Sequence, residues 1–244
     1  MSNAYEYEGG ELELFSGASN WKGYLQRLLA PFIRGEVLEV GAGIGGTTVF
    51  LRDVTHPRWT CLEPDATLAE RLERRVHELP AADRIRIEVG TVDELAEGEQ
   101  FDSVIYIDVL EHIADDAREL ARAARRLRPG GRVVVLSPAH AQLFTPFDAA
   151  VGHYRRYTRR TLRALTPPGL ELERCFYADA VGLLASLGNK LLLRKSMPST
   201  REIRLWDGWM VPISMRLDPL VGHRVGKSVI AVWRRPDGAP RVDA

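Results

Sequence analysis

The chain of 244 residues has only two cysteines, Cys61 and Cys175, and no excess of charge of either sign. Two cysteines far apart in the sequence exclude a disulfide framework and a zinc site with the usual cysteine spacing. The 33 basic and 33 acidic side chains give a formal net charge of zero, without the overall basic footprint of a nucleic-acid-binding domain. We therefore expect a reducing, cytoplasmic environment and no nucleic-acid partner.

Long apolar runs are also missing. No stretch reaches the roughly 20 residues that span a bilayer. The longest candidate, residues 180–193, is interrupted by Gly188, Asn189 and Lys190. No N-terminal segment has the order of charged, apolar and small residues that marks a signal peptide. The sequence thus predicts no transmembrane segment.

Short runs rich in valine and isoleucine alternate with segments of helical period, and 45% of the residues are hydrophobic. This alternation predicts an α/β fold with a doubly wound, mostly parallel sheet that has helices on both faces. The expected strands cover residues 36–40, 59–63, 84–89, 101–107, 132–137, 170–177 and 228–234. The expected helices cover residues 46–53, 66–79 and 115–127, and a turn at residues 128–131 is expected to separate the last helix from the next strand.

Two segments lie outside this alternation. Residues 1–35 are expected to form an N-terminal helical cap, because residues 21–33 are amphipathic. Residues 178–226 are too long for a loop without structure of its own and are expected to form a helical insertion or lid. The core then comprises residues 36–177 and a closing strand at 227–235, with a flexible tail at 236–244. A dimer surface and a shallow contact with a membrane are alternatives for the insertion.

A glycine-rich turn follows the first expected strand, in the order Val37-Leu38-Glu39-Val40-Gly41-Ala42-Gly43-Ile44-Gly45-Gly46. Glycines at this place let backbone N–H groups approach a ligand at the start of a helix. By itself the turn also fits the dinucleotide fingerprint. Glu63 ends the second strand, where an acid can accept hydrogen bonds from ribose hydroxyls, with helix capping as the alternative.

Glu39 separates two classes of cofactor. A carboxylate two residues before the first glycine would repel a pyrophosphate, but it suits a ligand that carries positive charge. The sulfonium and amino groups of S-adenosyl-L-methionine are both positive. The sequence therefore predicts this cofactor in preference to NAD.

With these features the chain resembles the class I S-adenosylmethionine-dependent methyltransferases. Residues 105–113 look like the fourth-strand motif of that family, and residues 127–132 look like the motif before its fifth strand. The resemblance covers about residues 20–177 and the final strand. It implies a methyltransferase with the sheet order 3-2-1-4-5-7-6 and an antiparallel seventh strand. It also implies a cofactor site made of Glu39, Gly41, Gly43, Gly45, Glu63, Thr91, Val92, Asp93, Asp108 and Val109.

His112 and His153 are the predicted catalytic residues. A base is needed only if the acceptor atom must lose a proton, and histidine titrates near neutral pH. Packing against the adenosine or capping a helix is an equally good interpretation of His112. A metal site made of His112, His140 and His153 would also need a carboxylate or thiolate ligand, so no metal is predicted.

The segment after the fifth strand is rich in arginine and tyrosine, and it follows a third candidate histidine. The predicted substrate-binding residues are His140, Tyr154, Arg155, Arg156 and Tyr157, because guanidinium groups bind phosphate and carboxylate in pairs of hydrogen bonds. A solvated helix start with Thr158 as its N-cap is the alternative. The charges are unevenly distributed: residues 1–150 hold 16 basic and 25 acidic side chains, and residues 151–244 hold 17 and 8.

The sequence predicts an enzyme that transfers a methyl group from S-adenosyl-L-methionine to a small or medium-sized organic acceptor, with anionic acceptors included. One alternative is a methyltransferase for a phosphate-bearing or lipid-linked glycan precursor. Another is a protein that binds the cofactor without catalysis and acts through partners. A monomer and a homodimer both fit the sequence, and a peripheral contact with a membrane stays an alternative.

Overall fold

The computed structural model describes residues 10–188 and 198–238, and its centre is a seven-stranded sheet in the order β3-β2-β1-β4-β5-β7-β6. Strands β1 to β5 pair in parallel, whereas β7 pairs antiparallel with both β5 and β6. The predicted sheet order and the antiparallel last strand are therefore confirmed. The strands are β1 (Val37–Val40), β2 (Trp59–Glu63), β3 (Ile85–Val89), β4 (Phe101–Ile107), β5 (Leu127–Pro138), β6 (Glu171–Ala178) and β7 (Ser228–Arg234).

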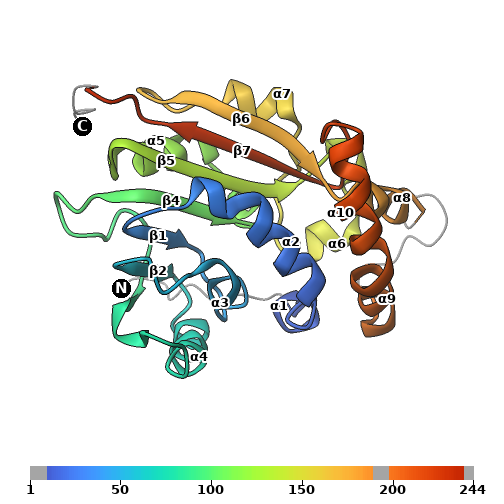
Figure 1. The fold of residues 1–244 in the computed structure, drawn as a ribbon, viewed down its shortest axis with the longest axis horizontal. Helices are drawn as coiled ribbons and strands as arrows, with labels where there is room; N and C mark the ends of the chain where they lie inside the picture. Colours follow the sequence, from blue (N-terminus) through green and yellow to red (C-terminus); the bar gives the residue numbers. More distant parts are fainter. Residues whose placement is uncertain (1–9, 189–197, 239–244) are drawn as a thin grey trace.

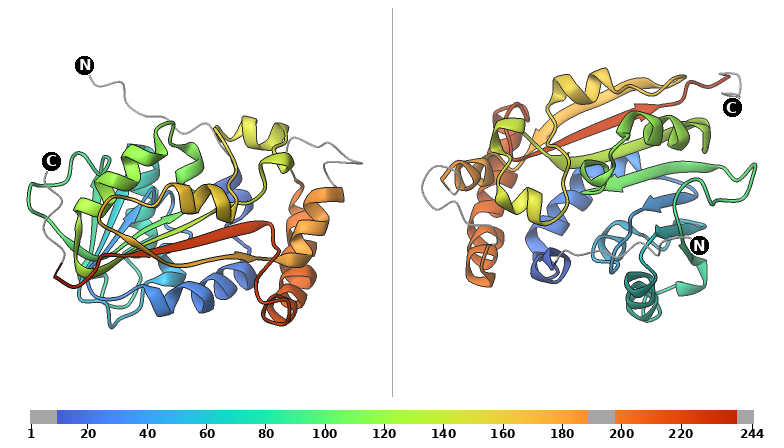
Figure 2. Two further views of the ribbon diagram at one scale, coloured as in Figure 1. Left: turned by 90° about the horizontal axis from the view of Figure 1, so that it is seen from above. Right: turned by 180° about the vertical axis from the view of Figure 1, so that it is seen from behind.

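Helices cover both faces of the sheet (Figure 2). Alternate side chains of a strand point to opposite faces, so Leu38 packs in one buried cluster and Val37 in the other. The first cluster includes α5 (Asp116–Arg125) and α7 (Arg159–Ala164). The second includes α2 (Ser19–Leu29), α3 (Thr48–Leu51) and α4 (Ala66–Val76). The remaining short elements are α1 (Glu11–Leu14), η1 (Ala30–Phe32), η2 (Ala82–Arg84), η3 (Leu110–His112), η4 (Ala141–Leu143) and α6 (Pro146–Ala150).

The turn expected at residues 128–131 is wrong. Strand β5 begins at Leu127, which pairs with Phe101, and it continues without interruption to Pro138. The pairing with β4 shifts its register between Phe101 and Ser103, and Gly130 has a φ of +76°. A bulge accommodates a proline and a left-handed glycine inside a strand, which the sequence pattern alone presents as a break.

The segment between β6 and β7 forms α8 (Ala180–Gly188), α9 (Thr200–Leu205), the π-helical η6 (Trp206–Met210) and α10 (Val211–Leu220). These helices lie beside the carboxyl ends of β5 and β6 (Figure 1). The end of the apolar stretch, from residue 189, and the end of the expected tail, from residue 239, lie outside the described residues. Over 10–188 and 198–238, no helix is long and apolar enough to cross a bilayer.

A buried carboxylate holds this insertion to the rest of the fold. Asp218 on α10 is fully buried and accepts a hydrogen bond from the Tyr24 hydroxyl on α2 at 2.7 Å. It also accepts from the N–H groups of Asp179 at 2.7 Å and Ala180 at 3.0 Å, at the start of α8. A buried carboxylate is tolerated only when such partners replace its water. Asp218 therefore ties α10, α8 and α2 together.

Two further aspartates repeat the arrangement. Asp207 in η6 accepts from the N–H groups of Trp21 at 2.8 Å and Asn20 at 3.2 Å, and so caps the N-terminus of α2. Asp179, in the left-handed region with a φ of +65°, accepts from the indole N–H of Trp206 at 2.7 Å. The insertion and the N-terminal helices consequently form one packed layer.

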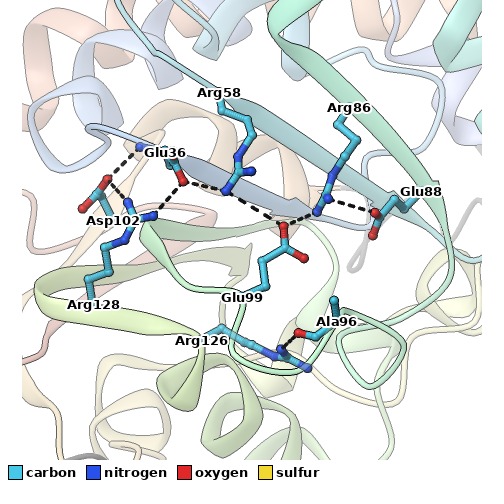
Figure 3. A network of polar contacts seen from close by, with 9 residues as sticks. All are labelled: Glu36, Arg58, Arg86, Glu88, Ala96, Glu99, Asp102, Arg126 and Arg128. Carbon is cyan, nitrogen blue, oxygen red and sulfur yellow. Dashed lines mark hydrogen bonds and ion pairs between the residues drawn. The ribbon is translucent and has the colours of Figure 1, made fainter.

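Ion pairs connect residues at the amino ends of the strands, away from the insertion (Figure 3). Glu36 contacts Arg58 at 2.6 Å and Arg128 at 2.8 Å, while Glu99 contacts Arg86. These residues lie at or near the amino ends of β1, β2, β5, β4 and β3. The arginines are partly exposed, so each ion pair contributes little to stability.

Replacing Asp218 by alanine is expected to lower the free energy of unfolding by about 2 to 4 kcal/mol, because buried donors on two elements lose their acceptor. Urea unfolding followed by circular dichroism measures the change. Leu220→Ala on the same helix is the matched control, since Leu220 is 83% exposed and its loss should cost less than about 0.5 kcal/mol. Equal stability of the two variants would contradict the role assigned to Asp218.

Candidate active site

A cavity of about 730 Å³ is lined by residues at the carboxyl ends of β4 and β5, the usual position of ligands in open α/β sheets. This volume falls within the range of about 300 to 1,000 Å³ that is typical of small-molecule sites. The glycine turn after β1 and the helices α1, α2, α6, α8 and α9 complete the walls. Its apolar lining includes Leu12, Phe15, Trp21, Leu25, Phe147, Val151, Ile203, Trp206 and Met210, and its polar lining includes Lys22, Asp108, Glu111, His112, His153, Arg156 and Lys227.

The backbone explains the glycines of the turn. Gly41, Gly43 and Gly45 have φ values of +67°, +55° and +74°, in the left-handed region that side chains disfavour. A Cβ atom on Gly41 would lie 2.7 Å from Val109, and one on Gly45 would lie 2.6 Å from Leu72. Gly41 and Gly43 line the cavity, whereas Gly45 packs against α4. The close approach of Val109 to Gly41 joins the turn to the end of β4.

Glu63 contacts the glycine turn from the end of β2. One carboxylate oxygen accepts the N–H of Gly43 at 2.7 Å, and the other accepts the N–H of Asp65 at 3.0 Å. Burial raises the pKa of Glu63, although these two hydrogen bonds favour the charged form. Glu63 is therefore adjacent to the cavity lining through Gly43, and its predicted contact with a ribose stays a prediction.

Glu39 points away from the cavity. It is buried, and one carboxylate oxygen accepts the Thr48 hydroxyl and the Trp59 indole N–H, each at 2.8 Å. Burial raises the pKa of Glu39 to about 7, against the effect of these bonds. The carboxylate thus holds the start of α3 and strand β2 to β1, and its predicted role toward the cofactor stays a prediction.

Three of the predicted cofactor residues, Thr91, Val92 and Asp93, lie outside the cavity lining. The N–H of Thr91 donates to Glu94 at 2.6 Å, Val92 is buried in the core, and Asp93 forms an ion pair with Arg122 at 2.6 Å. Asp108, by contrast, lines the cavity with a φ of +55°. The structure brings Asp108 to the glycine turn and leaves the other three residues beyond it.

The two predicted catalytic histidines lie side by side at the cavity wall. Their ring centroids are 4.6 Å apart and their planes meet at 83°. The Nδ1 atom of His153 lies 2.9 Å from a carboxylate oxygen of Asp148, so we assign its hydrogen to Nδ1 and leave Nε2 as an acceptor. Burial, and then the proximity of His153, lowers the pKa of His112 to about 4. The imidazole of His112 is therefore neutral at physiological pH.

Sequence reasoning missed Asp148, which organises this wall from α6. Arg156 donates to both of its carboxylate oxygens, at 2.7 and 2.9 Å. Burial alone would raise the pKa of Asp148, but the hydrogen bonds from His153 and Arg156 hold it well below its usual range. Asp148 lies in a capping box with Thr145, a signal that predicts a helix start rather than a site residue.

Glu111 is the second residue that sequence reasoning missed, although it stands inside the recognised motif. Its carboxyl group is fully buried beside the histidines, with Nε2 of His153 at 4.0 Å from Oε1. Burial, and then the charge of Asp108, raises the pKa of Glu111 well above its usual range. The site therefore has two different carboxyl groups, a charged Asp148 and a Glu111 for which the charged form is costly.

The predicted substrate residues are mostly engaged elsewhere. Arg156 lines the cavity, but its guanidinium is occupied by Asp148. Arg155 and the buried hydroxyl of Tyr157 both contact Asp116 at 2.7 Å, and the Tyr154 ring is exposed. The alternative expectation of an N-capped helix is observed, because the side chain of Thr158 accepts a hydrogen bond from the first turn of α7.

His140 lies apart from the other two histidines. Its ring stacks on Tyr177 with centroids 5.0 Å apart, and its Nε2 atom is 3.0 Å from the carbonyl oxygen of Gly226. It is not among the residues that line the cavity. The structure thus groups His112 and His153 with a carboxylate, Glu111, and not with a third histidine.

Two lysines, which no sequence motif predicts, also belong to the polar lining of the cavity. Lys22 on α2 donates to the carbonyl oxygen of Ser16 at 2.8 Å beside the glycine turn, and burial followed by the charge of Arg75 lowers its pKa to about 8. Lys227 lies 3.7 Å from the centre of the Trp206 ring. Both ammonium groups enter the cavity because the N-terminal helices and the insertion fold over the sheet.

The central part of the chain is similar to a known protein family. Residues 38–133 match the family model described as "Methyltransferase domain". A protein of transposon TN4556 from Streptomyces fradiae is 32% identical over 54% of this chain and 38% of its own length. Phthiotriol/phenolphthiotriol dimycocerosates methyltransferase 1 of Mycobacterium ulcerans is 32% identical over 55% of this chain and 50% of its own length. The chain thus spans half or less of these two relatives.

Solved structures agree with the fold. The structure of geranyl diphosphate methyltransferase in complex with SAM superimposes with a TM-score of 0.63 over 92% of this chain and 90% of that chain. The two sequences are 16% identical, so the likeness concerns the architecture. It extends over the helical insertion as well as the residues that match the family model.

The buried carboxyl group of Glu39 predicts a pH dependence of stability. Because folding raises its pKa from 4.5 to about 7, the folded state binds more protons between these values, and stability falls as the pH rises through them. Relative to Glu39→Gln, the wild-type protein should lose stability on the order of 3 kcal/mol between pH 4.5 and pH 8. Urea unfolding at a series of pH values measures the difference. Glu70→Gln, at an exposed position on α4, is the control, and a pH-independent difference for Glu39→Gln would refute the assignment.

Proposed function

Because the chain belongs to the class I S-adenosylmethionine-dependent methyltransferase family, we propose that it transfers the methyl group of S-adenosyl-L-methionine to a small or medium-sized organic acceptor with an apolar body. The observation that carries this proposal is the composition of one cavity. The glycine turn and Asp108 form part of its wall, the two histidines form another part, and apolar side chains of the cap and the insertion lie around them. Cofactor and acceptor would therefore meet inside one enclosed volume.

In this proposal the cofactor lies over the glycine turn. The cavity-lining backbone of Gly41 and Gly43 would approach the methionine part, and the buried ammonium group of Lys22 would pair with its carboxylate. Glu63 would exchange its bond to the Gly43 N–H for bonds from the ribose hydroxyls. Asp108, in its left-handed conformation, lines the cavity between the turn and the histidines.

The reaction is a displacement at the methyl carbon. A lone pair on the acceptor forms a bond to that carbon, the carbon–sulfur bond breaks, and its electron pair converts the sulfonium into the neutral thioether of S-adenosylhomocysteine. Alignment of the acceptor atom, the methyl carbon and the sulfur supplies much of the rate enhancement. If the acceptor atom bears a proton, His112 and His153 are the groups at the cavity wall that would accept that proton.

The lining favours an acceptor without a phosphate group. Asp148 takes the Nε and Nη2 donors of Arg156, while Asp116 and the carbonyl oxygen of Ala114 take Nη1 and Nη2 of Arg155, so both arginines are engaged within the fold. The aromatic and aliphatic side chains around the cavity instead suit an apolar body. The apolar lining favours a neutral acceptor over the phosphate-bearing glycan precursor, and a cavity that brings the glycine turn and the two histidines together favours an enzyme over a binding protein.

Glu63→Gln is expected to weaken the binding of S-adenosylhomocysteine about tenfold or more, because an amide replaces one of the two acceptors offered to the ribose. Isothermal titration calorimetry with S-adenosylmethionine, S-adenosylhomocysteine and NAD measures the change. Glu70→Gln, exposed on the following helix, should bind like the wild-type protein. Unchanged affinity of Glu63→Gln would remove the ribose contact. Tight binding of NAD without either sulfur ligand would overturn the proposed function.

The acceptor can be sought with methyl-labelled cofactor and a fractionated extract. We expect label in small molecules that partition into an organic solvent, because the cavity is lined mainly by apolar groups. Gly41→Ala is the negative control, since its Cβ would collide with Val109 and its φ is +67°. Circular dichroism shows whether that variant folds. Label found only in water-soluble phosphate compounds would contradict the neutral acceptor.

A further inference from the structure

The carboxyl group of Glu111 has an environment that the proposed reaction does not explain. It is fully buried in the end of β4 and η3, and neither oxygen makes a hydrogen bond to any described residue. The backbone N–H of Glu111, the Ser137 hydroxyl and the charge of Arg156 favour its charged form, but none of them has hydrogen-bonding geometry with either oxygen. Burying a carboxyl group without hydrogen-bond partners is unfavourable. A bound partner of Glu111 would explain why this group is tolerated.

Two histidines face the same point. The Nε2 atom of His153 lies 4.0 Å from Oε1 of Glu111, and the rings of His153 and His112 are 4.6 Å apart. One donor atom from each of the three residues lies within 4.8 Å of the others. In residues 10–188 and 198–238 this is the one group of three or more histidine, cysteine, aspartate or glutamate residues with such spacing.

We propose that Glu111, His112 and His153 bind a divalent transition-metal cation at the wall of the cavity. Metal–nitrogen and metal–oxygen bonds of about 2.1 Å place neighbouring ligand atoms about 3 to 3.4 Å apart. The three donor atoms, which lie within 4.8 Å of one another, would have to move closer by up to about 1 to 2 Å to reach that spacing. Two imidazole nitrogens and one carboxylate oxygen suit zinc, cobalt, iron or manganese better than magnesium or calcium, which prefer oxygen alone.

The residues behind the histidines are those that a metal site needs. Asp148 accepts the Nδ1 hydrogen of His153 at 2.9 Å, which directs the Nε2 lone pair toward Glu111. Arg156 in turn donates to both oxygens of Asp148 and holds that carboxylate in place. A carboxylate that orients a metal-binding histidine in this manner is a recurrent feature of metalloproteins.

Three protein ligands leave coordination positions for other groups, and all three residues line the cavity. The cation would take oxygen atoms of the acceptor in these positions and orient them toward the methyl group. This role rests on the proposed function, whereas binding of the cation does not. It also assigns the two histidines to holding the cation rather than to removing a proton. No metal is predicted from the sequence, because the three histidines lack a carboxylate or thiolate ligand there; in the structure Glu111 supplies a carboxylate beside two of them.

Titration of metal-free protein with Co²⁺, followed by visible absorption and by calorimetry, tests the site. The wild-type protein should bind one equivalent and develop d–d bands. Glu111→Gln should weaken binding at least about tenfold. Asp148→Asn should weaken it about 10 to 100 times through His153. His77→Asn removes an exposed histidine at the end of α4 and should bind Co²⁺ like the wild-type protein.

Equal affinity of Glu111→Gln and the wild-type protein would overturn the site, as would loss of binding in His77→Asn. Melting temperature and S-adenosylhomocysteine affinity show whether each variant is folded. If Glu111→Gln does not fold, nuclear magnetic resonance of the wild-type cobalt form decides instead. Paramagnetic shifts of the His112 and His153 ring signals support the proposal, and shifts of other histidines alone refute it. Methyl transfer that persists in metal-free protein would leave the proposed function standing while removing the role given to the cation.

Discussion

Buried carboxylates need partners, and much of this structure depends on how that need is met. Asp218 and Asp207 take hydrogen bonds from α2 and from the start of α8, and these bonds seat the insertion on the N-terminal helices. The layer that results covers the carboxyl ends of the strands. Without it the glycine turn and the histidines would lie in an open groove, and Trp206 and Lys22 would have no cavity to line.

Charged groups have different partners at the amino ends and at the carboxyl ends of the strands. At the amino ends, arginines and acids such as Arg128 and Glu36 form ion pairs with one another at the surface (Figure 3). At the carboxyl ends, backbone N–H groups of the turn, the Lys22 ammonium group and the Glu111 carboxyl group face a cavity. The parallel arrangement of β1 to β5 places the glycine turn and Glu111 at the same end of the sheet, because strand ends of one kind lie together, and α2 adds Lys22.

The cavity wall at the histidines is a chain of mutually dependent charges. Arg156 holds Asp148, Asp148 holds His153, and His153 faces Glu111. The guanidinium group that resembles a substrate handle in the sequence is thus part of a support for the imidazole. The position of His153 therefore depends on α6, because the capping box of that helix positions Asp148.

The sequence alone determined the strands and the glycine turn, and its resemblance to a known family implied the order of the strands. Hydrophobic period and glycine position are local properties, and the left-handed φ values at Gly41 and Gly43 are a local requirement. Tertiary structure decided the site. Arg155 and Arg156 are claimed by Asp116 and Asp148, while Glu111 and His153, far apart in the chain, become neighbours. Which polar groups are satisfied, and which are left facing a cavity, depends on partners that only folding brings together.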